Sequence, residues 1–370
     1  MDGRRIRAQI AKELAQIRRD RLTLALAFVL PLMTLLIFGF AIRLEAKDIP
    51  VAVQDWDGTA LSRQYAEGIY ATNQFIPAPV SMSAKPEQVI DRGQARAVVV
   101  IPPRCTDRIA TGSPCSVQFL IDGSDVNNAR VIRNGLEATN REFLRRTGQI
   151  PTTEALKLES RIWFNPGREE AKYIVPGVFG VVLWIFPALL AAVAMVREKD
   201  QGTIIQIYVS GISALELLLG KAIAYLILGL GISAVVVGLG CGIFGLRLAG
   251  DPLPLLLGIP MFLWASISFG LLIGVRASTQ IAAVQGVSIV GFLTAFLLSG
   301  FIYPLSNIPF PLSLIPNLVP TRYFIAIARD AFVRGSGWPG VWAFWLAMAL
   351  LGLLFFNAAR KGLSRMQLPG

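Results

Sequence analysis

Few side chains in this sequence have the types and spacing that enzyme chemistry requires. The sequence contains no histidine, which excludes Ser-His-Asp and Cys-His catalysis and removes the commonest ligand of zinc. It also lacks the G-x-x-x-x-G-K-S/T pattern of an ATP-binding P-loop. Two acidic pairs, Asp55 with Asp57 and Asp122 with Asp125, follow apolar runs and lie beside a glycine, a setting typical of turns. We therefore predict no catalytic residue, no metal site and no cofactor bound by this chain.

The cysteines leave one chemical alternative open. Cys105 and Cys115 lie ten residues apart in a segment that is predicted below to lie outside the cytoplasm, where a disulfide is chemically allowed. The alternative is two small buried thiols, because spacing along the chain does not fix the separation of two Cα atoms. Cys241 lies within a long apolar stretch and is predicted to serve packing only.

Long uncharged stretches are the strongest structural signal in the sequence. A bilayer core takes roughly 20 apolar residues of helix, and backbone amides in hydrocarbon must pair within their own segment. Uncharged stretches of more than 20 residues therefore predict six transmembrane helices. They are residues 22–42, 174–196, 222–246, 252–275, 277–302 and 335–359.

Residues 43–173, between the first two stretches, have the composition of a soluble domain, with 17 basic and 16 acidic side chains. Runs suited to strands alternate there with runs suited to helices, which predicts a small α/β domain and leaves its strand order open. Ser62 is the expected N-cap of the first helix. The expected strands are 49–55, 75–81, 97–101 and 116–121, and the expected helices are 62–70, 86–93, 106–110 and 127–146.

The excess of basic residues predicts how the chain is oriented in the membrane. Fourteen Lys and Arg side chains lie in the tails and short loops on one side of the predicted helices, against four on the other side. Because short basic loops stay in the cytoplasm, both termini are predicted to be cytoplasmic and residues 43–173 to lie outside. The predicted fold is therefore a polytopic α-helical membrane protein with six transmembrane helices and an inserted extracytoplasmic α/β domain. Charge placed in this way indicates membrane topology and membrane lipid as a partner, not nucleic acid.

The first 21 residues contain an apolar stripe at helical spacing. Basic side chains fall on the other side of the same predicted helix, so residues 4–19 are expected to form an amphipathic helix at the cytoplasmic interface. The alternative is charge that sets topology beside an accidental stripe. The residues of the stripe are Ile6, Ile10, Leu14 and Ile17.

A charged cluster after the second predicted helix resembles a known family. Arg197-Glu-Lys-Asp-Gln-Gly-Thr203 leads through Ser210-Gly-Ile-Ser213 to Glu216-Leu-Leu-Leu-Gly-Lys221. This order resembles the cytoplasmic coupling segment of type-2 ABC exporter permeases, which docks onto a separate ATPase subunit. The resemblance implies that residues 197–213 form a coupling helix with an apolar face for the ATPase, and that Glu216 and Lys221 flank the start of the third helix. Gly202 is expected to end the turn that contains Glu198 and Lys199, because glycine tolerates the left-handed conformation of a C-cap. The implied coupling residues are Arg197, Glu198, Lys199, Gly202, Thr203, Ile204, Ile205, Tyr208 and Glu216.

Three other places resemble the same family. Val53-Gln-Asp-Trp-Asp-Gly58, with Val98–Pro103 and Leu120–Asp125, is similar to the outer domain of its multidrug-exporter-like members, and Asn165-Pro-Gly167 to the exit from that domain. Ser299–Pro304 and Leu318–Phe324 resemble its external half-helices. Five prolines interrupt this uncharged region, which independently favours short pieces over a second span. The predicted divisions are 1–21 (interface helix), 22–42, 43–173, 174–360 with an external re-entrant segment at 303–334, and the cytoplasmic tail 361–370.

The resemblance implies a multi-pass permease of the cell membrane, specifically a bacterial inner membrane, that exports a hydrophobic drug or lipid-like substrate. It also implies several partners: a separate ATP-binding subunit, a second identical or related permease, and a periplasmic adaptor with an outer-membrane channel. The rival interpretation is a membrane receptor whose outer domain senses a ligand. It is disfavoured because the predicted cytoplasmic segments are too short for an output module. A membrane enzyme is weakened by the absence of histidine, and an ion-coupled carrier by the placement of all charges at segment ends.

Overall fold

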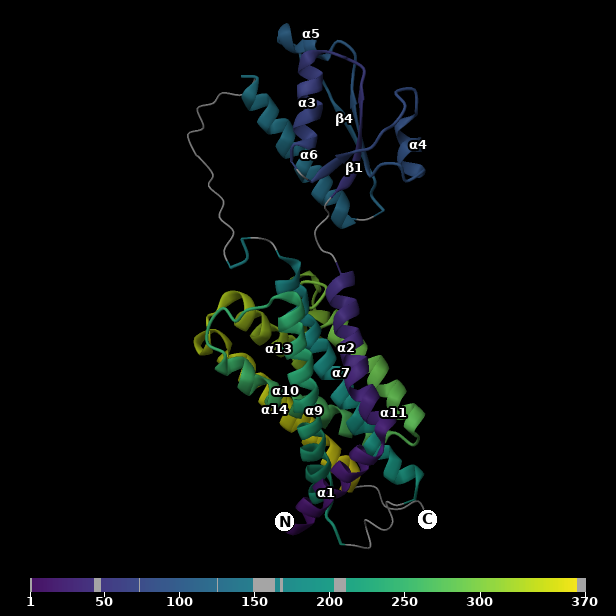
Figure 1. Ribbon diagram of the computed structural model, residues 1–370, viewed down its shortest axis with the longest axis vertical. Coiled ribbons are helices and arrows are strands. Elements are labelled where there is room, and N and C mark those ends of the chain that lie inside the picture. The colour runs from purple at the N-terminus through teal and green to yellow at the C-terminus, as the bar shows by residue number, and fades with distance from the viewer. Residues whose placement is uncertain are drawn as a thin grey trace. The chain divides into compact units, whose positions relative to one another are not determined.

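The computed structural model describes residues 2–42, 48–72, 74–124, 126–148, 164–166, 169–202 and 211–364. The chain divides into two compact units, Met1–Ile42 with Arg161–Gly370, and Arg43–Ser160, each with its own hydrophobic core (Figure 1). The smaller unit therefore ends earlier than the predicted domain boundary at residue 173. The helix that follows it begins at Glu170.

The larger unit is a helical bundle. Within the described part of the chain, six helices are long and apolar enough to cross a membrane, which confirms the predicted number. The third of them starts two turns earlier than predicted, because Ser213 caps its first turn. The helices of the bundle are α1 (Gly3–Arg19), α2 (Arg21–Ala41), α7 (Glu170–Asp200), α9 (Ala214–Phe244), α10 (Leu253–Arg276), α11 (Gln280–Gly286), the π-helical segment η1 (Val287–Gly291), α12 (Phe292–Leu297) and α14 (Trp338–Ser364).

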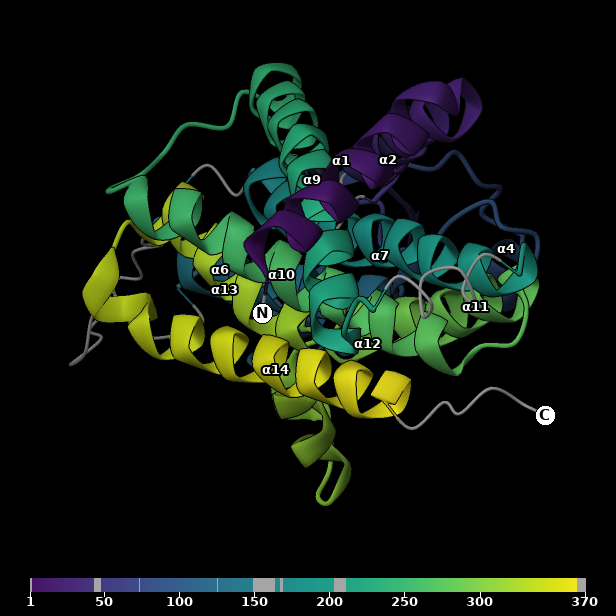
Figure 2. The same cartoon turned by 90° about the horizontal axis from the view of Figure 1, so that it is seen from below.

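Helix α7 is the centre of this bundle, because α2, α9, α10, α11 and α13 (Pro320–Arg329) all pack against it (Figure 2). Two glycines of α10 allow the backbones of α7 and α10 to approach closely. A Cβ atom at Gly270 would lie 2.1 Å from the carbonyl oxygen of Ala188, and one at Gly274 would lie 2.7 Å from that of Ala192. Neither position can accept a side chain without moving the helices apart, so α7 and α10 form a closely fitted pair.

The predicted re-entrant region contains short helical pieces. They are η2 (Leu305–Asn307), η3 (Leu312–Leu318), α13 (Pro320–Arg329) and η4 (Asp330–Arg334). The guanidinium group of Arg329 donates hydrogen bonds to the carbonyl oxygens of Gly300 (2.9 Å) and Phe301 (3.2 Å). This contact joins the end of α13 to the turn that follows α12.

The smaller unit confirms the predicted alternation of strands and helices. The sheet order is β2-β1-β3-β4, with β1 parallel to β2 and β3, and with β4 antiparallel to β3. Helices α3 and α6 cover one face of the sheet, and α4 covers the other (Figure 1). Their apolar side chains pack against the sheet in two separate clusters. The elements are β1 (Ile49–Asp55), α3 (Ala60–Tyr70), β2 (Phe75–Pro77), α4 (Pro86–Asp91), β3 (Ala97–Ile101), α5 (Cys105–Ala110), β4 (Gln118–Ile121) and α6 (Val126–Arg146).

The N-cap predicted for α3 is wrong by one turn. Thr59 is the N-cap, and Ser62 is its partner at the third helical position, where side chain and backbone bond reciprocally. Both residues can cap a helix. The choice is made by Asp55, whose carboxylate accepts hydrogen bonds from Ser62 Oγ (2.7 Å) and from the amide of Gly58 (3.0 Å).

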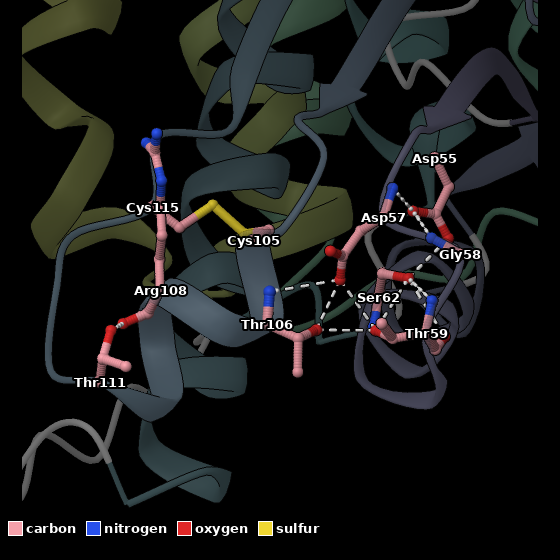
Figure 3. The surroundings of a disulfide bond; sticks show 10 residues. All are labelled: Asp55, Asp57, Gly58, Thr59, Ser62, Cys105, Thr106, Arg108, Thr111 and Cys115. Atoms are coloured by element: carbon pink, nitrogen blue, oxygen red, sulfur yellow. Dashed lines mark hydrogen bonds between the residues drawn. A yellow bond between two sulfur atoms is a disulfide. The ribbon is translucent and has the colours of Figure 1, made fainter.

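Asp55 is a turn residue, as predicted, and Asp57 also joins two elements (Figure 3). Asp57 Oδ2 accepts hydrogen bonds from Thr106 Oγ1 (2.5 Å) and Thr59 Oγ1 (2.9 Å), which ties the start of α5 to the start of α3. Desolvation alone would raise the pKa of Asp57, but these hydrogen bonds outweigh it and hold the pKa below its usual value. Asp122 accepts from the amide of Ser124 (2.9 Å), whereas Asp125 lies outside the described residues.

The structure contains a disulfide between Cys105 and Cys115, whose Cα atoms lie 5.4 Å apart (Figure 3). The bond joins the first residue of α5 to the segment before β4. Cys241 is a free thiol in α9.

Peptide mapping without reductant should recover the fragments that carry Cys105 and Cys115 as one joined species. The paired change Cys105→Ala with Cys115→Ala should lower the free energy of unfolding of the smaller unit by at most about 3 kcal/mol, because the closed loop is short. Denaturant-dependent proteolysis of the purified protein measures this loss, and Cys241→Ala serves as the control. Recovery of both thiols in the free form would reject the bridge.

Candidate functional site at the junction of α1, α7 and α9

Of the residues predicted for coupling, Arg197, Glu198 and Glu216 lie near the place where α1 meets the C-terminal end of α7 and the N-terminal end of α9. Helix α1 packs along α9 at this end of the bundle (Figure 2). We call the group formed by Lys12, Glu13, Glu198 and Lys221, with Gln9, the junction. Its members come from three helices, and no local sequence pattern predicts the side-chain contacts between them.

Lys221 is the centre of the junction. Its side chain is fully buried, and its ammonium group donates to Glu13 Oε1 (2.5 Å), to the carbonyl oxygen of Ala194 (3.1 Å) and to Glu198 Oε1 (3.3 Å). Lys12 Nζ lies 2.6 Å from the same oxygen of Glu198. Two buried carboxylates thus face one buried and one half-exposed ammonium group, and this balance is what allows charge to remain in the interior.

Helix α1 contributes a polar stripe that the sequence interpretation missed. The four residues of its predicted apolar stripe are only half-buried, whereas Gln9 and Glu13 are buried between them. Gln9 Nε2 donates to Glu13 Oε1 (2.8 Å). A Cβ atom at Gly220 would lie 2.5 Å from Gln9 Cγ, so the glycine of α9 lets α1 approach. A signal was present in the sequence, since Gln9 and Glu13 are spaced by four residues on the same side as the stripe.

The charged run that starts at Arg197 lies within α7, not after it as predicted. Helix α7 continues to Asp200, so the run forms its last turn. Arg197 Nη2 lies 3.4 Å from Asp20 Oδ2 at the turn between α1 and α2. Lys199 contacts the end of α10, and Asp200 the start of α11. Together with Glu198 in the junction, these neighbours bind to different parts of the bundle.

Glu216 also acts through the backbone. It lies at the third position of α9 and accepts from the amide of Ser213 (2.9 Å), its own N-cap, and from the amide of Asp2 (2.7 Å) at the start of α1. Arg5 donates to the carbonyl oxygen of Gly211. The prediction that Lys221 flanks the start of this helix is wrong, because Lys221 lies two turns inside α9.

The segment expected to contact an ATPase is only partly described. Gly202 has φ = +66° and follows the end of α7, which is the left-handed conformation that the sequence predicts. Thr203, Ile204, Ile205 and Tyr208 lie outside the described residues. The described residues on either side of 203–210 are fixed, through the last turn of α7 before it and through Arg5 and Gly211 after it.

Within the described part of the chain, no three His, Cys, Asp or Glu side chains are grouped as metal ligands would be. The junction pairs its carboxylates with lysines. Its chemistry is therefore that of a structural joint between helices.

Lys221→Met should lower the thermal stability of the purified protein sharply. The change keeps the volume of the side chain but leaves Glu13 and Glu198 without their buried cation, which costs about 3–5 kcal/mol. Lys12→Met is the matched control: the Lys12 side chain is 38% exposed, so its loss should cost about 1 kcal/mol or less. Equal thermal shifts for the two variants would contradict the central place of Lys221.

Comparison with known proteins gives a consistent result. The family description "ABC-2 family transporter protein" matches residues 21–361. The chain is 28% identical over 346 residues to the probable multidrug ABC transporter permease YbhS of Escherichia coli K12, covering 91% of this chain and 90% of that protein. It is 25% identical over 360 residues to the probable multidrug ABC transporter permease YbhR, covering 95% and 97%. It is 24% identical over 346 residues to the inner membrane transport permease YhhJ, covering 89% and 91%; both are also from E. coli K12. Because the family match extends over nearly the whole chain, this protein belongs to the ABC-2 family of transporter proteins.

Proposed function

We propose that the chain is the permease subunit of an ABC exporter, which moves a hydrophobic or amphipathic substrate, drug or lipid-like, out of the cytoplasm or the inner leaflet. The observation that carries the proposal is similarity along almost the full chain to proteins named multidrug ABC transporter permeases. ATP is hydrolysed by a separate subunit. This division of labour agrees with a sequence that has no P-loop.

The proposal places the junction at the cytoplasmic end of the bundle. The tails and loops at that end contain fourteen of the basic residues counted above, and short basic loops stay in the cytoplasm. The smaller unit then lies outside, in an oxidising compartment if the membrane is a bacterial inner membrane, where a disulfide persists. There it is exposed to the released substrate, or to a periplasmic adaptor that leads to an outer-membrane channel.

A cysteine introduced at Ser124 tests this orientation. Ser124 is exposed in the smaller unit, so in a Cys241→Ala background a membrane-impermeant thiol reagent should label Ser124→Cys in intact cells. A cysteine introduced at Arg4, exposed in α1, is the matched control and should react only after lysis. The opposite labelling pattern would invert the topology.

The proposed coupling mechanism rests on the described residues on either side of segment 203–210. The ATPase binds this segment, and closure of two ATPases on a pair of permeases pushes on it. Along the chain the segment lies between α7 and α9, and Lys221 joins both of these helices to α1 through Glu198 and Glu13. A displacement of the segment therefore moves three helices together instead of bending one loop. The paired permease is a second copy of this chain or a related one.

Gly202→Val tests the coupling function. Valine disfavours φ = +66°, so the change strains the start of the segment by about 1–3 kcal/mol. We expect normal membrane insertion but weaker ATPase association, or transport per ATP lowered by roughly fivefold or more. The matched control is Gly58→Val in the smaller unit, where φ is +65° and a Cβ would also meet no atom within 4 Å.

The control should impose the same local strain without affecting coupling. If Gly202→Val assembles with the ATPase and transports at the normal rate, residues 203–210 do not couple the two subunits.

A further inference from the structure

The last turn of α7 makes a second set of contacts that the junction does not use. Lys199 Nζ donates to the carbonyl oxygens of Gly274 (3.2 Å), Val275 (2.5 Å) and Ala277 (3.0 Å) at the C-terminal end of α10. The last carbonyl groups of a helix have no partner within the helix, and they carry the negative end of its dipole. Lys199 therefore satisfies three of these acceptors with one ammonium group.

Asp200 serves the next helix in the complementary way. Its Oδ2 atom accepts from the amide of Gln280 (3.4 Å), the first residue of α11. A carboxylate is favoured at a helix N-terminus, where amide groups lack partners and the dipole is positive. Two adjacent residues of α7 thus hold both sides of the turn between α10 and α11, a cation on the side where one helix ends and an anion where the next begins.

The two helices on either side of this turn differ in how freely they can move. Helix α10 is fixed to α7 by the backbone contacts at Gly270 and Gly274, and 67% of the residues in its most apolar stretch are buried. For α11 with η1 and α12 the buried share is 22%. A movement at the end of α7 therefore shifts the α11–η1–α12 helix relative to α7 more readily than it shifts α10, which stays attached to α7.

This lightly packed helix also contains a place to bend. Residues Val287–Gly291 form a π-helical turn, and π turns interrupt the regular hydrogen-bond ladder and mark hinges and kinks. The indole N–H of Trp184 on α7 is buried and has no hydrogen-bond partner within the described part of the chain. It lies 3.9 Å from the position that a Cβ atom would take at Gly291. An unsatisfied hydrogen-bond donor therefore lies beside the π-helical turn.

We propose that Lys199 and Asp200 are positioning residues for transport. They convert movement of segment 203–210 into reorientation of the α11–η1–α12 helix, which bends at residues 287–291. The inference rests on the proposed function. It adds that the charged run at the end of α7 transmits movement along two routes. Glu198 connects it to α1 and α9, and Lys199 with Asp200 connects it to the turn before α11.

Lys199→Met tests the connection from α7 to the turn before α11, in the full permease with its ATPase, in membranes. ATPase binding and ATP hydrolysis by the variant are measured in the same preparation, so that transport is expressed per ATP hydrolysed by the assembled complex. Transport per ATP hydrolysed should fall by at least about fivefold. Lys199→Arg, which keeps a cation and donors near the three carbonyl groups, should restore most of it.

Hydrogen–deuterium exchange in the permease measures directly whether Lys199 and Asp200 hold the start of α11 in place. Amides of residues 280–286 should exchange faster in Lys199→Met and in Asp200→Asn, whereas those in the middle of α10 should not change. Arg276→Met is the matched control, because it removes an exposed cation from the same turn without touching the contacts of Lys199. It should leave both exchange and transport unchanged.

The possible failures are distinguishable. An unmodified permease that binds no ATPase would overturn the proposed function itself. A Lys199→Met permease that binds the ATPase and transports normally would overturn only the present inference, and so would normal exchange at residues 280–286. Faster exchange together with normal transport per ATP would reduce Lys199 to a structural cap of α10.

Discussion

The buried ammonium group of Lys221 is the interaction on which the membrane unit depends at its junction end. An unpaired charge in the interior is too costly to remain, so Lys221 requires Glu13 from α1 and Glu198 from α7. Glu13 in turn requires Lys221, whereas Glu198 is shared between Lys221 and Lys12. Three helices that are distant in the sequence are therefore held in one arrangement. Between Lys221 and Glu13 the requirement is mutual, which makes the contact specific as well as stabilising.

Four charged residues follow one another at the end of α7 because each of them binds a different neighbour. Arg197 pairs with Asp20, Glu198 enters the junction, Lys199 binds the end of α10, and Asp200 binds the start of α11. Because successive side chains of a helix point about 100° apart, one turn of α7 reaches neighbours on all its sides. In the coupling proposed above, movement of this turn reaches α1, α9 and α11, while the glycine contacts keep α10 attached to α7.

The smaller unit is organised by different physics. Its sheet is covered on both faces by apolar helix surfaces, and polar contacts are concentrated at the turns. Asp57 joins the starts of α3 and α5, and the disulfide fixes α5 to the approach to β4. This unit has its own core and its own covalent constraint, so its fold does not depend on the packing of the helical bundle.

The sequence by itself determined the six spans, the alternation of strands and helices in the smaller unit, the left-handed glycine at residue 202 and the family resemblance. These features are local: hydrocarbon demands long uncharged helices, strands and helices differ in period, and glycine alone adopts positive φ easily. The tertiary structure decided the sheet order, the choice of Thr59 over Ser62 as cap, the place of Lys221 inside α9 and its pairing with Glu13. Charge in a sequence is ordinarily a sign of exposure, so Lys221 could be taken for the end of a helix until partners more than 20 and 200 residues away were seen beside it. Such pairing depends on distances in space, which the spacing of residues along the chain does not contain.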